Sequence, residues 1–208
     1  MQRVASEAGT VIGKHRRPSS WVGLGLDAGL RLWILAFLIE VMRSPNDPRF
    51  AGKAIPIRNL VVVLGCSALF PLVQALRHRW RRYPAWLDSL YLSIFWLDMA
   101  GNSFDLYDRI LWFDLIPHAH GTGALAVALR GAFGRSPLEA AGLATIVHVA
   151  LEAQEHYTDV FFGTHNVRGL ADTVNDLTAG LIGVALYLTA FETAKRLAAI
   201  DRATATPA

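Results

Sequence analysis

The chain has 208 residues, of which 53% are apolar and only 18% charged, and its mean hydropathy is +0.32. This composition excludes a disordered or collagen-like chain and argues against a water-soluble enzyme, because too few polar side chains are present to cover a globule. The single cysteine excludes a disulfide framework and a cysteine-based zinc finger. The net charge of +3 does not indicate a nucleic-acid partner, since the basic residues lie between apolar runs and not on one face. We therefore predict a membrane protein.

Six apolar segments approach the length of about 20 residues that crosses the core of a bilayer. They are residues 24–41, 57–76, 86–104, 111–129, 138–154 and 174–194. The sequence thus predicts an all-α, polytopic membrane helical bundle of about six transmembrane helices. We expect residues 1–20 to form a basic cytoplasmic segment, 21–196 the transmembrane domain and 197–208 a cytoplasmic tail.

The distribution of Lys and Arg predicts the orientation of the bundle, because cytoplasmic loops are enriched in these residues. The two termini and the loops on their side hold 13 Lys and Arg residues, against 6 on the opposite side. Both termini are therefore expected in the cytoplasm. The first outer loop argues the other way, since it carries four of the six outer cations.

Ionisable groups inside a membrane cost roughly 2.5–3.5 kcal/mol each on insertion scales, so each one calls for a reason. Four of the expected helices carry polar residues at helical spacing, and in the predicted topology all four sets fall at the outer ends of their helices. The sets are Asp98, Asn102 and Asp105; Asp114, His118 and His120; Glu152, Glu155 and His156; and Asp172, Asn175 and Asp176. This agreement in depth predicts one shared, outward-facing pocket.

Carboxylate oxygens and imidazole nitrogens are ligands for hard or borderline metal ions, and helical bundles build such sites from facing helices. We expect a divalent metal (Zn²⁺, Mg²⁺ or Mn²⁺), while proton binding or pairing with Arg168 remains an alternative use of the carboxylates. The predicted metal ligands are His118, Glu152, Glu155, Asp172 and Asp176. The predicted catalytic residues are Asp114, His118 and Glu155, with Asp114 as the general base or as the group that orients His118. The second-rank candidates are Asp98, Asn102, Asp105, His120, His156 and Arg168.

Three further features are assigned structural roles. His120 would point away from His118 on a regular helix, so it joins the pocket only if Pro117 distorts the chain. His148 is interpreted as a packing histidine, with orientation of a neighbouring ligand as the alternative. The Asp27–Arg31 pair, spaced i, i+4, is expected to neutralise itself.

At the polar residues the chain resembles the YjdF-like bacterial inner-membrane proteins and, more distantly, the VanZ-like family. Asp114-Leu-Ile-Pro-His118 is similar to the VanZ-like Asp-x-x-x-His. Glu152-Ala-Gln-Glu155 corresponds to the Glu-x-x-Gln position with Glu for Gln, as in the YjdF-like branch. The run from Gly163-Thr164 to Asp172-Thr173-Val174-Asn175-Asp176 resembles the YjdF-like Gly-Thr…Asp-Thr-x-x-Asp, and Gly180 and Gly183 match that family's small-residue stripe. The resemblance implies a multi-pass protein of the bacterial inner (plasma) membrane. VanZ itself is linked to glycopeptide-antibiotic resistance, and no reaction is established for the group.

Three functions remain open from the sequence. The first is a metal-dependent hydrolase or transferase that acts on a lipid or lipid-linked envelope headgroup. The second is a non-catalytic module that binds such a headgroup in the same pocket. The third is a proton- or cation-coupled transporter, against which the sequence shows no chain of charges crossing the membrane. Membrane lipid is the expected partner in each case, and the oligomeric state is left open.

Overall fold

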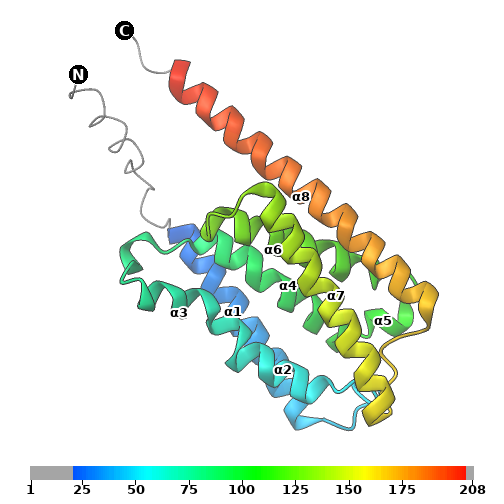
Figure 1. Ribbon diagram of the computed structural model, residues 1–208. Helices are drawn as coiled ribbons and strands as arrows, with labels where there is room; N and C mark the ends of the chain where they lie inside the picture. Colours follow the sequence, from blue (N-terminus) through cyan, green and yellow to red (C-terminus); the bar gives the residue numbers. More distant parts are fainter. Residues whose placement is uncertain (1–20, 205–208) are drawn as a thin grey trace.

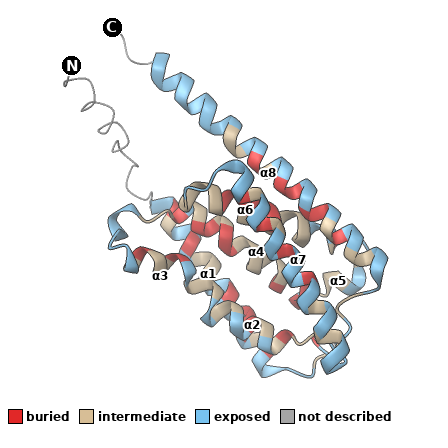
Figure 2. Cartoon of the chain, viewed as in Figure 1, coloured by how far each residue is buried: buried red, intermediate tan, exposed pale blue. Residues whose placement is uncertain are grey.

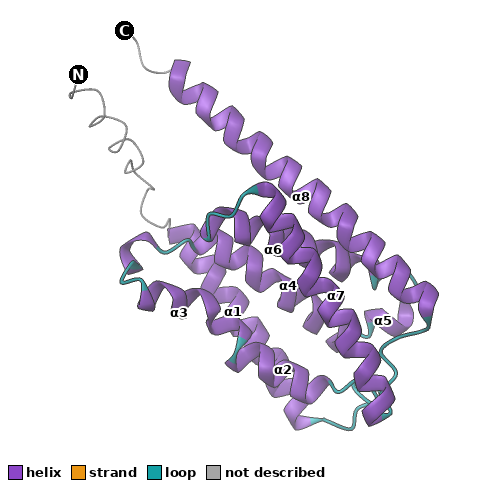
Figure 3. Ribbon diagram, viewed as in Figure 1, coloured by secondary structure: helices purple, strands orange, loops and turns teal. Residues whose placement is uncertain are grey.

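A computed structural model describes residues 21–204, so the expected basic segment 1–20 and the end of the tail, 205–208, lie outside the described residues (Figure 1). The described part consists of helices and loops, which confirms the all-α prediction (Figure 3). The helices are α1 (Trp21–Arg43), α2 (Ile55–Leu64), α3 (Leu69–Leu76), α4 (Ala85–Ser103), α5 (Leu106–Arg109), α6 (Leu115–Ala132), α7 (Pro137–Phe162) and α8 (Leu170–Thr204), with 3₁₀ turns at Cys66–Ala68 and Trp80–Arg82.

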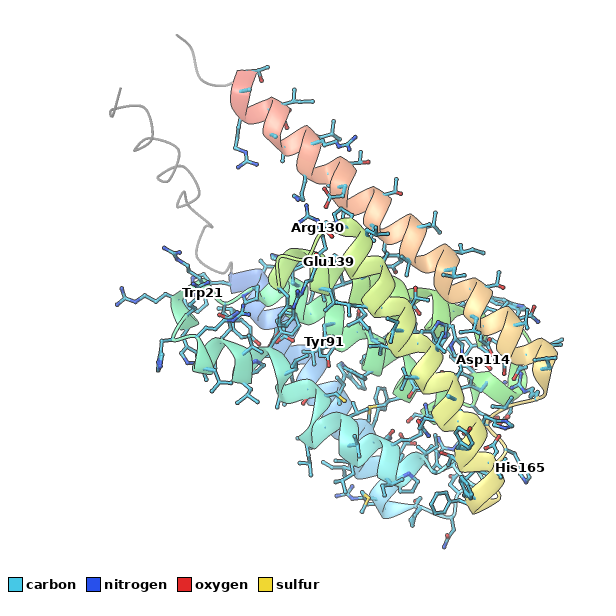
Figure 4. The ribbon with its side chains drawn as sticks, viewed as in Figure 1. Trp21, Tyr91, Asp114, Arg130, Glu139 and His165 are labelled. Carbon is cyan, nitrogen blue, oxygen red and sulfur yellow. The ribbon has the colours of Figure 1, made fainter. Side chains whose placement is uncertain are left out.

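The long helices run alternately between two ends of one bundle (Figure 1). We call one end the loop end; it gathers residues 44–54, 104–114 and 163–169. These loops touch one another: the His165 N–H donates to the Gly52 carbonyl, and Lys53 pairs with Asp108. The opposite, terminal end holds the start of α1 and the end of α8. In Figure 4, Asp114 and His165 mark the loop end, while Trp21 and Arg130 mark the terminal end.

Residues 57–76, expected as one span, form two helices joined by Gly65 and the 3₁₀ turn Cys66–Ala68. The side chain of Ser67 donates to the Val63 carbonyl, an interaction that bends helices. Two residues into α3, Pro71 has no N–H to offer the Ser67 carbonyl one turn earlier. That free carbonyl instead accepts a hydrogen bond from Arg31 of α1. The break therefore provides an acceptor inside the bundle.

Helix α6 is the centre of the bundle and packs against α4, α7 and most extensively α8. Glycines allow the closest approach. A Cβ added at Gly183 would lie 1.9 Å from the carbonyl oxygen of Ala119, and one at Gly123 would lie 2.7 Å from the carbonyl oxygen of Gly183. A Cβ at Gly180 would lie 2.2 Å from Nδ1 of His148. The small-residue stripe of α8 thus sets how deeply α6 and α7 reach into the α8 surface.

Figure 2 shows that many residues on the outside of the bundle are exposed. Many of these exposed residues have large apolar side chains, as a lipid-facing surface requires. Within residues 21–204, three segments are long and apolar enough to cross a membrane: Trp21–Arg43, Ile55–Leu76 and Leu170–Thr204. The expected spans in α4, α6 and α7 are less apolar because they carry most of the polar residues singled out above. The count of six spans therefore stays a prediction. Helix α8 also continues past residue 196, the expected end of the transmembrane domain, to Thr204.

Candidate metal centre

Five titratable side chains from three helices converge between α6, α7 and α8. Asp114 is the residue before α6, and His118 lies one turn later on the same face. His148 and Glu152 are spaced i, i+4 on α7, and Asp176 lies in the second turn of α8. The close packing of α6 on α8 brings these positions together.

The imidazole of His118 is the centre of this arrangement, since each of its nitrogens faces a separate group of ligand atoms. Its Nε2 lies 3.3 Å from Oδ1 of Asp114 and 3.8 Å from Oδ1 of Asp176. Its Nδ1 lies 2.8 Å from Nε2 of His148 and 3.3 Å from Oε1 of Glu152. In both groups the three ligand atoms lie within 4.8 Å of one another.

The two sides of the ring differ in spacing, and the difference suggests different roles. Ligands held about 2.0–2.2 Å from one tetrahedral ion are roughly 3.3–3.6 Å apart. On the Nε2 side the two distances from His118, 3.3 and 3.8 Å, lie in or just above that range. On the Nδ1 side Oε1 of Glu152 also lies in that range, 3.3 Å from His118 and 3.4 Å from His148. The 2.8 Å between His118 and His148 is instead an ordinary hydrogen bond. The Nε2 side is therefore better suited to an ion, and the Nδ1 side to fixing the ring.

Two carboxylate oxygens in the centre are buried and lack a hydrogen-bond partner among the described residues: Oε1 of Glu152 and Oδ1 of Asp176. Their side chains are only 5% and 6% exposed. Buried carboxylates without donors are costly, so each needs a cation or a proton close by. The Asp114 side chain makes no capping hydrogen bond to α6 and is thus available as a ligand as well.

His120 does not join the centre. Its Nε2 lies 2.9 Å from the hydroxyl of Ser93, and its Nδ1 lies 2.7 Å from the hydroxyl of Tyr187. Pro117 lies in the first turn of α6, where proline fits a regular helix, and α6 continues without a break to Ala132. The distortion that would have turned both histidines to one site is absent from α6.

Glu155, one turn beyond Glu152, belongs to a neighbouring ionic cluster. Its Oε1 lies 3.9 Å from Nη1 of Arg58, whose Nη2 lies 3.0 Å from Oδ1 of Asp98. The hydroxyl of Tyr107 donates to the same Asp98 oxygen at 2.9 Å. Burial raises the pKa of Tyr107 well above 10, so its hydroxyl remains a donor. Arg58 thus links α2, α4 and α7 beside the metal centre.

The remaining candidates lie outside the two groups around His118. The carboxylate of Asp172 accepts the Arg168 N–H at 2.9 Å, and the Arg168 guanidinium donates to the Tyr107 carbonyl. Asn102 donates to the Asp98 carbonyl, and Asp105 has a left-handed backbone (φ 59°) before α5. The following residues are exposed: His156 and His165.

The loop between α7 and α8 is held in place by Asp159. Its carboxylate accepts hydrogen bonds from the Thr164 hydroxyl and from the N–H groups of Asn166 and Val167. Burial alone would raise the pKa of Asp159, but these hydrogen bonds outweigh it and hold the pKa below its usual 3.8. The loop that carries His165 and Arg168 is therefore a fixed turn.

His148, which the sequence predicts as a packing histidine, lies against His118, while Glu155, predicted as a metal ligand, faces Arg58. An arginine three residues inside an apolar helix was a signal that it needs a buried partner. No such signal distinguishes Glu152 from Glu155, because either could face α6.

Neither a family model, nor a curated protein, nor a solved structure matches the chain. The assignment of a role to the His118 centre therefore rests on its chemistry and on its place in the bundle.

Proposed function

We propose that the protein is a multi-pass membrane protein that binds a divalent metal ion through Asp114, His118 and Asp176 and acts on a lipid or lipid-linked headgroup as a hydrolase or transferase. The observation that carries the proposal is the Nε2 side of His118. There, one imidazole and two carboxylates meet at ligand spacing, and a buried oxygen of Asp176 has no hydrogen-bond partner within residues 21–204. The resemblance to the YjdF-like proteins belongs to this proposal and supports the multi-pass, inner-membrane placement.

The Nδ1 side supplies what a metal-binding histidine requires. Such a histidine is usually oriented by a hydrogen bond from its other nitrogen to a carboxylate or a similar group. His148 and Glu152 occupy this position around Nδ1 of His118. A bound Zn²⁺, Mg²⁺ or Mn²⁺ would lower the pKa of a water and polarise a headgroup oxygen. The chain itself contributes the ligands, their orientation and a buried wall on one side.

The surroundings of the loop end favour a substrate that sits in the membrane surface. Large apolar side chains of the loop end are strongly exposed, among them Leu111 (86%), Trp112 (61%), Phe161 (73%) and Phe162 (80%). Aromatic side chains of this kind anchor proteins at the level of lipid headgroups. With both termini in the cytoplasm, as the cation distribution predicts, the centre lies toward the outer surface of the membrane.

The test is the metal content of the full chain purified in detergent, with each variant measured in parallel by elemental analysis. We expect bound metal in the wild type and its loss in the double variant Asp114→Asn, Asp176→Asn, which removes both carboxylates on the Nε2 side. Asp108→Asn is the matched control, because Asp108 is an exposed acid at the same end that pairs with Lys53.

Equal metal content in the wild type and in the double variant would exclude a metal at Nε2. The pocket would then have to bind a headgroup or protons directly. Loss of metal in the control as well would indicate adventitious binding to surface acids.

A further inference from the structure

A second buried ionic cluster lies in the half of the bundle nearer the terminal end. Arg31 of α1 is its centre, with Asp27 one turn earlier on the same helix. Asp88 lies in the first turn of α4, and Tyr83 lies just before that helix. The predicted Asp27–Arg31 pair is present, but it is only part of a larger arrangement.

The guanidinium of Arg31 serves both carboxylates. Its Nε lies 3.0 Å from Oδ1 of Asp27, and its Nη2 donates to Oδ2 of Asp88, which also accepts from the Tyr83 hydroxyl. The remaining Arg31 nitrogen donates to the Ser67 carbonyl that Pro71 leaves free. Each nitrogen of Arg31 thus donates a hydrogen bond, while Oδ2 of Asp27 and Oδ1 of Asp88 have no hydrogen-bond donor among the described residues.

The charges of this cluster do not balance if every group is ionised, since one guanidinium faces two carboxylates. The Asp88 side chain is 0% exposed and that of Asp27 is 10% exposed, so solvent does not neutralise the excess. The Tyr91 hydroxyl donates to the Cys66 carbonyl and brings no positive charge to the cluster. A net negative charge buried at this depth is costly unless a cation or a proton joins it.

We propose that Asp27 and Asp88 form a proton-binding site, in which one proton is held between the two carboxyl groups and exchanges with the medium. The proton provides the donor that the two unpartnered oxygens lack, and it leaves one carboxylate to balance Arg31. Asp27 and Asp88 accept hydrogen bonds from Nε and Nη2 of the same guanidinium, which brings the two carboxyl groups close together. When the proton leaves, the site gains one negative charge that no described residue compensates.

The site is independent of the metal centre, as it uses other helices and lies toward the other end of the bundle. Intramembrane ionisable residues of this kind commonly serve proton or ion transfer. This half of the bundle therefore contains a group that can exchange a proton, where the sequence predicted only that Asp27 and Arg31 neutralise each other.

Infrared difference spectroscopy on the full chain in detergent tests the proposal. The wild-type spectrum minus that of Asp88→Asn should contain one protonated-carboxyl band that shifts in D₂O, and Asp27→Asn should lose the same band because Asp88 then ionises against Arg31. Asp108→Asn is the control and should leave the band in place. A difference spectrum without the band, or a band that persists in Asp27→Asn, would overturn the shared proton.

Thermal unfolding provides a second readout. Each single Asp→Asn variant still leaves one carboxylate for Arg31, so its melting temperature should stay within about 3 °C of the wild type. The double variant leaves Arg31 unpaired and should melt on the order of 10 °C lower. A double variant that melts like the single ones contradicts the proposal. If the melting temperature of the wild type rises with the Na⁺ concentration and that of Asp88→Asn does not, the site binds a metal cation and the proton-binding proposal is overturned.

Discussion

Replacing Gly183 by alanine tests whether the contact between α6 and α8 holds together the side chains around His118. The new Cβ would lie 1.9 Å from the carbonyl oxygen of Ala119 and 2.6 Å from its carbonyl carbon. These obstacles are backbone atoms of α6, so no side chain can rotate away and the two helices must separate. Overpacking of this kind costs about 1–3 kcal/mol, and the upper end applies here. The higher helix propensity of alanine offsets about 1 kcal/mol of that cost.

The expected net loss is about 2 kcal/mol, which lowers the melting temperature of a chain of this size by about 4–8 °C. Thermal unfolding of the full chain in detergent measures it, and Gly142→Ala is the matched control. Gly142 lies on an exposed part of α7 and has nothing within 4 Å of an added Cβ, so this variant should be as stable as the wild type or slightly more stable. Because α6 carries His118 and α8 carries Asp176, Gly183→Ala should also retain less metal. Equal melting temperatures for the two variants would refute the close packing.

The helices could be predicted from the sequence because each long apolar run has the length of a membrane helix. Every expected span overlaps a helix, and the main departure is the division of 57–76 at Gly65. That departure depends on Ser67 and Pro71. Their effect on the helix becomes apparent only in the structure, where Arg31 donates a hydrogen bond to the Ser67 carbonyl that Pro71 leaves free. Helices α7 and α8 also extend beyond the expected spans, to Phe162 and Thr204, because polar helical turns that flank an apolar run carry no hydropathy signal.

The gathering of polar residues toward one end could also be anticipated, because alternating helix direction follows from short loops. Which residues face one another could not, since that depends on the rotation of each helix about its axis. Glu152 and Glu155 illustrate this point: they are three residues apart, yet one lies beside His118 and the other faces Arg58. The rotation of α7 is set by contacts such as His148 against Gly180, 32 positions away in the chain.

Two further predictions concern the centre and the loop beside it. His148→Ala should weaken metal affinity about 10–100-fold without abolishing binding, because His148 orients His118 through a hydrogen bond at Nδ1 of His118. A competition titration measures the affinity. An unchanged affinity would contradict this orienting role of His148. Asp159→Asn should speed amide exchange at Asn166 and Val167 near neutral pH, since the carboxylate that accepts from both is lost. The pKa of Asp159 is lower in the folded chain than its usual 3.8. The stability that the ionised carboxylate contributes is therefore fully present above pH 3.8 and is lost as the pH falls through the pKa of Asp159 in the folded chain. The difference between variant and wild type, compared at equal pH by hydrogen exchange and mass spectrometry, should therefore shrink as the medium is acidified below 3.8. A difference that stays constant down to the most acidic condition would mean that the shape of the side chain, and not its charge, holds the loop.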